Sequence, residues 1–135
     1  MTDRQLQLLV QFRLTEAEET LREAEILLAQ SAFRGSVNRS YYAMFYAVSG
    51  LLATRGLGTS KHIGVMGLVD REFVKTGVFS KELSRSFHRA FDERQASDYG
   101  EMLMPDQELA AGLLGQAKMF IHEIKAQLAK VGFEL

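Results

Sequence analysis

The sequence predicts an all-α protein, folded as an up-and-down four-helix bundle with one additional helix. Three observations predict it: long blocks carry apolar residues at helical spacing, glycines separate those blocks, and there is one proline. Short connections between long helices make neighbours antiparallel, which gives a bundle. With 135 residues, we expect a single helical domain over residues 1–135.

The first two blocks predict two long helices, at about residues 4–31 and 34–55. The first carries an apolar seam with steps of three and four residues, formed by Leu14, Ala17, Leu21, Ala24 and Leu28. Its opposite face is rich in carboxylates, which is typical of a solvated surface. The second block is apolar over much of its circumference, which indicates a central helix or an interface.

A shorter third helix is expected at about residues 61–76. Thr59 or Ser60 is a suitable N-cap for it, and Gly77 is a suitable stop.

The fourth and fifth helices are expected at about residues 80–97 and 106–132. Ser80 is the predicted N-cap of the fourth helix, and Asp106, directly after Pro105, is that of the fifth. The apolar stripe of the fourth helix reads Leu83, Phe87, Ala90 and then Arg94.

Bulk composition excludes several classes of function. The net charge of −1 and the pI of about 6.3 do not suit general coating of nucleic acid, so any nucleic-acid contact needs a local patch. The absence of cysteine excludes disulfides and thiol catalysis, and it fits a cytoplasmic protein. The longest apolar run is too short and polar to span a membrane.

The sequence also lacks common cofactor and metal motifs. No Glu-x-x-His pair, H-E-x-x-H motif or phosphate-binding glycine loop is present, so we expect neither a metal nor a cofactor.

The residues that stand out are polar groups on apolar stripes. Arg94 lies one turn beyond Ala90 on the core stripe, where a guanidinium requires a partner. One interpretation is a structural ion pair with Asp98, four residues on. The other is an active-site arginine. For Tyr99, a ring whose hydroxyl finds a backbone acceptor is the simpler interpretation.

Asn38 is a second polar group on a core stripe, at the start of the second helix. Counting one reversal per connection makes the second and fourth helices parallel. Asn38 and Arg94 are then expected near opposite ends of one chain, to meet only across a homodimer whose helices pack antiparallel.

Three blocks, in order and spacing, resemble the HEPN domain: "SVNRSYYAMFYAVSGLLATRGL", "SKHIGVMGLVDREFVKTG" and "FDERQASDYGE". The resemblance covers about residues 14–130. It is strongest to small stand-alone bacterial and archaeal members encoded beside minimal nucleotidyltransferases.

The resemblance implies an all-α, HEPN-like bundle that is usually dimeric. Many HEPN domains are metal-independent ribonucleases or toxins paired with a nucleotidyltransferase antitoxin. Their site is an arginine followed after four to six residues by a histidine, at the dimer cleft. Arg94 matches the arginine, but Asp98 and Tyr99 stand where the histidine is expected. A tyrosine of ordinary pKa is a poor base at neutral pH.

Three functions follow from the resemblance. The first is a homodimeric partner of a nucleotidyltransferase in a toxin–antitoxin-like module, binding nucleotide or RNA through Arg94, Asn38 and Arg39. The second is a metal-independent endoribonuclease that uses Arg94 with Asp98 or Tyr99. The third is a helical interaction module without catalysis.

Overall fold

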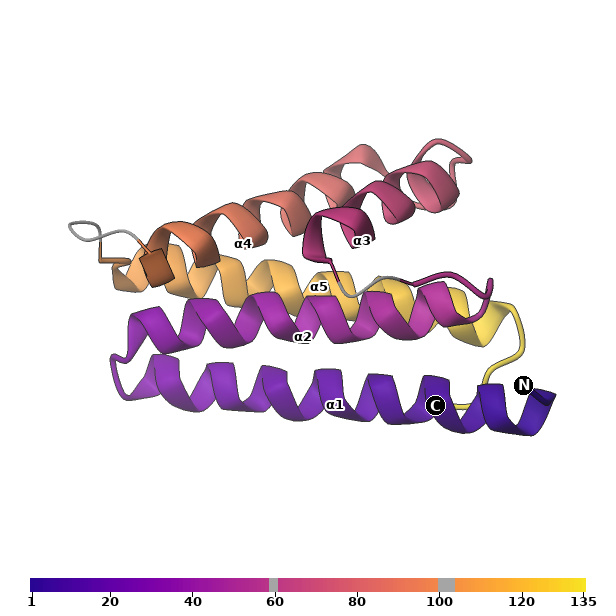
Figure 1. The fold of residues 1–135 in the computed structure, drawn as a ribbon. Coiled ribbons are helices and arrows are strands. Elements are labelled where there is room, and N and C mark those ends of the chain that lie inside the picture. The colour runs from indigo at the N-terminus through magenta and orange to yellow at the C-terminus, as the bar shows by residue number, and fades with distance from the viewer. Residues whose placement is uncertain (59–60, 100–103) are drawn as a thin grey trace.

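A computed structural model describes residues 1–58, 61–99 and 104–135, without the side chain of Ile63. Its helices are α1 (Asp3–Ala29), α2 (Phe33–Ala53), α3 (His62–Val69), α4 (Lys81–Tyr99) and α5 (Gln107–Lys130), and a π-helical turn, η1 (Asp70–Val74), continues α3. Figure 1 shows four long helices side by side and the shorter α3 resting on them. The predicted all-α fold is confirmed, and within the described residues no strand interrupts it.

Side-chain caps fix where three of these helices begin. Thr2 accepts a hydrogen bond from the backbone N–H of Gln5, whose side chain caps Thr2 in return. The hydroxyl of Ser80 accepts from the N–H of Leu83, and the carboxylate of Asp106 accepts from that of Leu109. The predicted caps Ser80 and Asp106 are therefore confirmed.

The helices α1 and α2 pack closely against each other. A Cβ added to Gly50 would lie 2.9 Å from a methyl group of Leu14, so only glycine allows this spacing. Near the other end of the pair, the buried Ser36 hydroxyl donates to the Ala24 carbonyl at 2.8 Å. The predicted seam of α1 faces this contact, with Leu14, Ala17 and Ala24 fully or nearly buried.

The expected direction of α4 was wrong. His62, at the start of α3, packs on Phe45 near the middle of α2, with ring centroids 4.4 Å apart. At the end of η1, Phe73 lies under the guanidinium of Arg55, which follows α2. The chain therefore returns along α2 before α3 begins, and α3 runs parallel to α2. The connection adds no reversal, so α2 and α4 are antiparallel.

The third helix is also shorter than expected. It is α-helical only to Val69 and then widens into η1, where Lys75 N–H donates to the Asp70 carbonyl. The expected stop at Gly77 is confirmed by its positive φ of 80°. The expected N-caps Thr59 and Ser60 lie outside the described residues, and Lys61 holds the N-cap position.

A stack of aromatic rings connects three helices through the core. Tyr41 of α2 lies parallel to Phe87 of α4, with centroids 5.9 Å apart, and Phe87 stacks in turn on Phe120 of α5 at 5.3 Å. All three side chains are buried. Among the described residues, none of the helices has the length and apolarity needed to cross a membrane.

Candidate functional site

Arg94 lies at the end of the core stripe of α4, as predicted. Its guanidinium sits over two rings of α2, 5.5 Å from the centre of Tyr41 and 5.2 Å from that of Tyr42. Its Nε donates to Oδ2 of Asp98 at 3.1 Å, and only 12% of the side chain is exposed. The predicted ion pair with Asp98 is therefore present, and the aromatic faces offset the desolvation of the charge.

Asp98 also connects Arg94 to α2. Asn38 Nδ2 donates to the same Oδ2 at 3.2 Å, and Asn38 Oδ1 accepts two hydrogen bonds from Arg39, at 3.0 and 2.7 Å. The expectation that Asn38 and Arg94 lie at opposite ends of one chain was wrong. Because α2 and α4 are antiparallel, both residues reach Asp98 within a single protomer.

Arg39 extends this network toward α1. Its guanidinium lies 5.1 Å from the centre of the Tyr42 ring and 3.8 Å from a carboxylate oxygen of Glu23. Tyr42 is thus flanked by two arginines, Arg39 and Arg94. Four of the five sequence-predicted site residues, Asn38, Arg39, Arg94 and Asp98, form one connected group.

His62 joins this group from α3, and it was not among the predicted site residues. Its Nδ1 lies 2.5 Å from the hydroxyl of Tyr41, and its ring stacks on Phe45. Burial, followed by the positive charge of Arg94, lowers the pKa of His62. Burial likewise raises the pKa of Tyr41, an effect that Arg94 opposes, so Tyr41 stays a hydroxyl at neutral pH.

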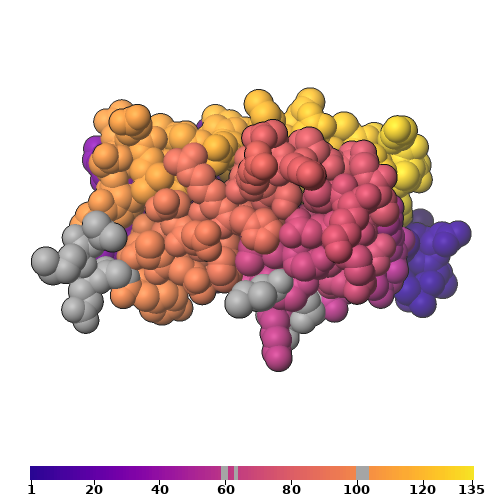
Figure 2. Space-filling model, turned by 90° about the horizontal axis from the view of Figure 1, so that it is seen from above, coloured from indigo at the N-terminus to yellow at the C-terminus, as the bar shows by residue number. Residues whose placement is uncertain are grey.

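Arg94 and His62 line one cleft between α3 and α4, with a volume of about 520 Å³. Lys61, Phe91 and Tyr99 also line it. Figure 2 shows this face, with α3 in magenta beside α4 in orange. Tyr99 is 74% exposed at the rim. The prediction that its hydroxyl finds a backbone acceptor stays a prediction.

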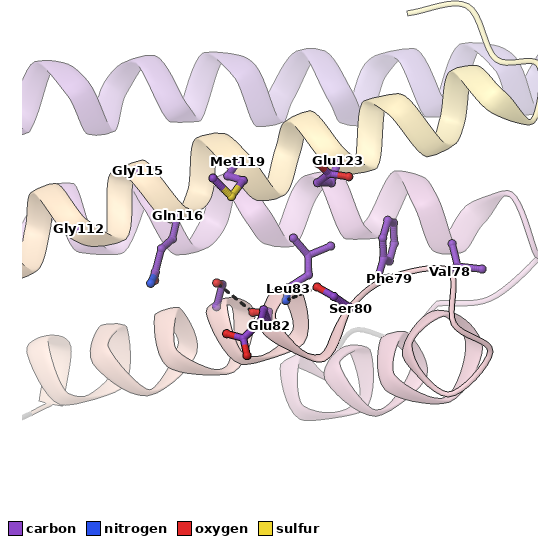
Figure 3. A pocket seen from close by; sticks show the side chains of 11 residues that line it. Val78, Phe79, Ser80, Glu82, Leu83, Gly112, Gly115, Gln116, Met119 and Glu123 are labelled. Atoms are coloured by element: carbon purple, nitrogen blue, oxygen red, sulfur yellow. Dashed lines mark hydrogen bonds between the residues drawn. The ribbon is translucent and has the colours of Figure 1, made fainter.

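A second hollow lies between α4 and α5 and has a volume of about 640 Å³. Figure 3 shows its lining, which includes Leu83, Met119 and Gln116. Gly112 and Gly115 of α5 contribute no side chains to it. Among the described residues, the charged side chains that line it are the carboxylates of Glu82 and Glu123, so this groove does not suit an anion.

No group of three or more His, Asp or Glu side chains in the described part of the chain is arranged to hold a metal ion. The Asp70 carboxylate instead ties η1 to α4, since it accepts from Ser84 at 2.5 Å and contacts His88 Nε2 at 2.9 Å. This cluster is a helix-to-helix contact.

Sequence reasoning missed His62 because it looked for a histidine on the same helix as Arg94. The available signal was the position of His62 directly after the glycine-rich connection, where α3 begins. Only the return of the chain along α2 brings it to Tyr41, and that return leaves no periodic pattern in the sequence.

Comparison with known proteins identifies the family. The model of the HEPN domain matches residues 10–127. The chain belongs to the HEPN family. The HEPN resemblance proposed from the three sequence blocks is therefore confirmed.

The chain is also similar to several curated proteins and, in its fold, to a solved structure. The chain is 39% identical to a UPF0332 protein of Thermotoga maritima, over 87% of this chain and 89% of that protein. It is 34% identical to Putative toxin MJ0142 of Methanocaldococcus jannaschii, over 84% and 77%, and 33% identical to Putative toxin MJ0605 of the same organism, over 85% of each. The crystal structure of TT1696 from Thermus thermophilus shares the fold, with a TM-score of 0.72, 16% identity and coverage of 88% and 98%.

Proposed function

We propose that this HEPN protein is the toxin-like member of a two-protein module, and that its Arg94 cleft binds a phosphate group of RNA or of a nucleotide. Two relatives, 34% and 33% identical over 84% and 85% of this chain, carry the name "Putative toxin". The proposed partner is a nucleotidyltransferase, as the family resemblance implies. The proposed assembly is a homodimer, as the family resemblance implies.

The orientation of the Arg94 guanidinium carries this proposal. Its Nε is bound to Asp98, while the two terminal nitrogens have no hydrogen-bond partner among the described residues. Those nitrogens are the pair that grips two phosphate oxygens in bidentate recognition. The rings of Tyr41 and Tyr42 fix the plane of the guanidinium, so little side-chain entropy is lost on binding.

RNA binding by Arg94→Ala tests the proposal. A labelled single-stranded RNA is titrated with wild type and variant, and dissociation constants are measured between about 50 and 200 mM salt. We expect at least a tenfold loss of affinity and a salt slope that is smaller by about 0.7, the value for one lost phosphate contact on single-stranded nucleic acid. Inorganic phosphate and ATP serve as competitors.

The matched control is Arg85→Ala. Arg85 lies on the same helix and pairs with Glu82, and its side chain is 71% exposed outside the cleft. Circular dichroism checks that both variants stay folded. Equal RNA affinities for Arg94→Ala and wild type would contradict the proposal and favour an interaction module without an RNA site.

Partner and assembly are tested separately. Co-expression with a nucleotidyltransferase encoded beside this chain is expected to relieve any growth arrest that the chain causes alone. Light scattering of the purified chain is expected to give the mass of two 15.2 kDa protomers.

A metal-independent endoribonuclease is the second candidate function. The observation that favours it is His62, which supplies the proton-exchanging group that the neighbourhood of Asp98 and Tyr99 lacks. Cleavage of RNA in the presence of EDTA is its direct test.

A further inference from the structure

We infer that His62, oriented by Tyr41, is the proton-exchanging residue of the Arg94 cleft for the RNA cleavage named above as the second candidate function. This inference rests on the proposed binding of RNA phosphate by Arg94. It assigns a catalytic role to a residue outside the α4 motif, and a positioning role to a buried tyrosine of α2.

Contacts on two sides fix the imidazole of His62. Its Nδ1 is bound to Tyr41, and one ring face stacks on Phe45. Nε2, the other ring nitrogen, has no hydrogen-bond partner among the described residues. Since His62 lines the same cleft as Arg94, Nε2 is the nitrogen available to a ligand there.

Tyr41 suits the orienting role because it is buried and rigid. It is fully buried between Phe87 and Phe91, and its hydroxyl reaches only the imidazole among the described residues. A tyrosine hydroxyl either donates to Nδ1 or accepts from it. The pair therefore supports both neutral tautomers of His62, one with a basic Nε2 and one with an acidic Nε2–H.

The charge state of His62 suits a base. The groups that face it are Tyr41 and Tyr42 of α2 and Arg94 of α4, and Lys61 precedes it in the cleft wall. Because burial and Arg94 both lower its pKa, the imidazole is neutral at physiological pH. A neutral imidazole beside a fixed cation matches the need for a base next to a bound phosphate.

The reaction balances without metal, oxidant or second substrate. Nε2 of His62 takes the proton of the ribose 2′-hydroxyl as the 2′-oxygen forms a bond to phosphorus. The bond from phosphorus to the 5′-oxygen breaks, and that oxygen takes a proton from water or from the imidazolium. The products are a 2′,3′-cyclic phosphate and a 5′-hydroxyl. Arg94 stabilises the negative charge on the pentacoordinate phosphate.

The alternatives predicted from the sequence fit this role less well. Asp98 Oδ2 already accepts hydrogen bonds from both Arg94 and Asn38, so this oxygen is occupied by protein donors. Tyr99 is 74% exposed at the rim of the cleft, so solvent holds its ring less firmly than the packed rings around His62 hold the imidazole.

The experiment compares cleavage and binding for the same variants. Single-stranded RNA with a fluorophore and a quencher is incubated with purified protein and EDTA, and product ends are identified by mass spectrometry. His62→Ala and His62→Gln are expected to cleave roughly 100- to 10,000-fold more slowly than wild type, with RNA affinity within about threefold. His122→Gln, an exposed histidine of α5, is the control and is expected to keep the wild-type rate.

Tyr41→Phe tests the positioning role, because it retains the ring and removes only the hydroxyl. We expect kcat to fall while KM stays constant, and the rising limb of the pH–rate profile to move. A purely structural role for the hydroxyl would lower stability and leave that profile in place. A substrate with a single 2′-deoxyribose at the cleaved linkage is expected to remain intact.

The outcomes separate this inference from the proposed function. RNA binding that depends on Arg94, without any cleavage by wild type at high protein concentration, would overturn the role of His62 and leave RNA binding standing. Cleavage that His62→Ala retains would also overturn it and return the role to Asp98 or Tyr99. Wild-type protein that binds neither RNA nor ATP would overturn both proposals.

Discussion

The groove between α4 and α5 and the cleft between α3 and α4 lie on the two sides of one helix. The groove is the larger, at about 640 Å³ against about 520 Å³. Its walls are mainly apolar, and its charged residues are acidic. The smaller cleft contains Arg94, His62 and Lys61 against aromatic rings. Fixed cations beside aromatic faces, rather than volume, therefore distinguish the candidate site.

The two hollows also arise differently. The groove exists because Gly112 and Gly115 of α5 have no side chains, and a Cβ at either would meet nothing within 4 Å. The cleft exists because the chain returns along α2 before α3 begins, which sets α3 beside α4 (Figure 1). Side chains can therefore be added at Gly112 and Gly115 without a clash. The shape of the cleft, in contrast, depends on how α2, α3 and α4 pack together.

The largest expected effect concerns Phe87, the middle ring of the aromatic stack in the core. Phe87→Ala removes a buried ring that stacks on both Tyr41 and Phe120. We expect a loss of about 3–5 kcal/mol in the free energy of unfolding, measured by urea denaturation. Phe12→Ala, whose side chain is 60% exposed on α1, is the control and is expected to change stability by less than about 0.5 kcal/mol. Similar losses for both would show that the stack is not a structural centre.

A second prediction compares the RNA affinity of a variant in the cleft with that of a variant in the groove. Arg94→Lys keeps the charge but loses the planar fork that stacks on Tyr41 and Tyr42. We expect roughly tenfold weaker RNA binding, equivalent to about 1.4 kcal/mol. Gly115→Leu, which fills the groove, is expected to leave RNA affinity unchanged. If Gly115→Leu weakened binding more than Arg94→Lys, the groove and not the cleft would be the RNA site.

Asp98→Asn is expected to have a smaller effect of opposite sign. The amide oxygen still accepts from Arg94, but the negative charge that opposes an incoming phosphate is gone. RNA affinity is expected to rise several-fold, while the free energy of unfolding falls by about 1 kcal/mol or less. Fluorescence titration and urea denaturation measure the two quantities. A loss of affinity would mean that Asp98 orients Arg94 more than it repels RNA.

The smallest effect is a pH dependence of stability. The pKa of His62 is lower in the folded chain than its ordinary 6.5, so the unfolded chain binds the extra proton first as pH falls. Wild type is expected to lose stability below about pH 6.5. His62→Gln, which cannot titrate, is expected to lose less over the same range. Identical slopes in urea denaturation from about pH 7.5 to about pH 5.5 would contradict the effect of burial on His62.

The sequence was sufficient for the features that periodicity encodes. The helices, the caps Ser80 and Asp106, and the place of Arg94 on the core stripe all follow from local spacing and cap chemistry. The pairing of Arg94 with Asp98 follows from their separation by one helical turn.

The sequence was insufficient where a non-helical connection decides the geometry. Counting one reversal per connection made α2 and α4 parallel. The connection between α2 and α3 instead runs back along α2, and its composition does not distinguish this path from a simple reversal of the chain. Because of that error, Asn38 and Arg94 were expected at opposite ends of the chain. His62 was missed for the same reason, since its contacts with Tyr41 and Phe45 are long-range and depend on the path of this connection.

The contact between the two ends of the chain has a practical consequence for handling this protein. Gln7 and Gln11, early in α1, donate to the Glu134 carbonyl at 2.5 and 3.0 Å. Both ends therefore lie together, at the end of the bundle opposite the connection between α1 and α2 (Figure 1). Asn38 lies near the start of α2 and Asp98 near the end of α4, so both residues lie at the end of the bundle that holds this connection. An affinity tag, a dye or a fused domain attached at either terminus is therefore expected to leave the hydrogen bonds to Asp98 uncovered.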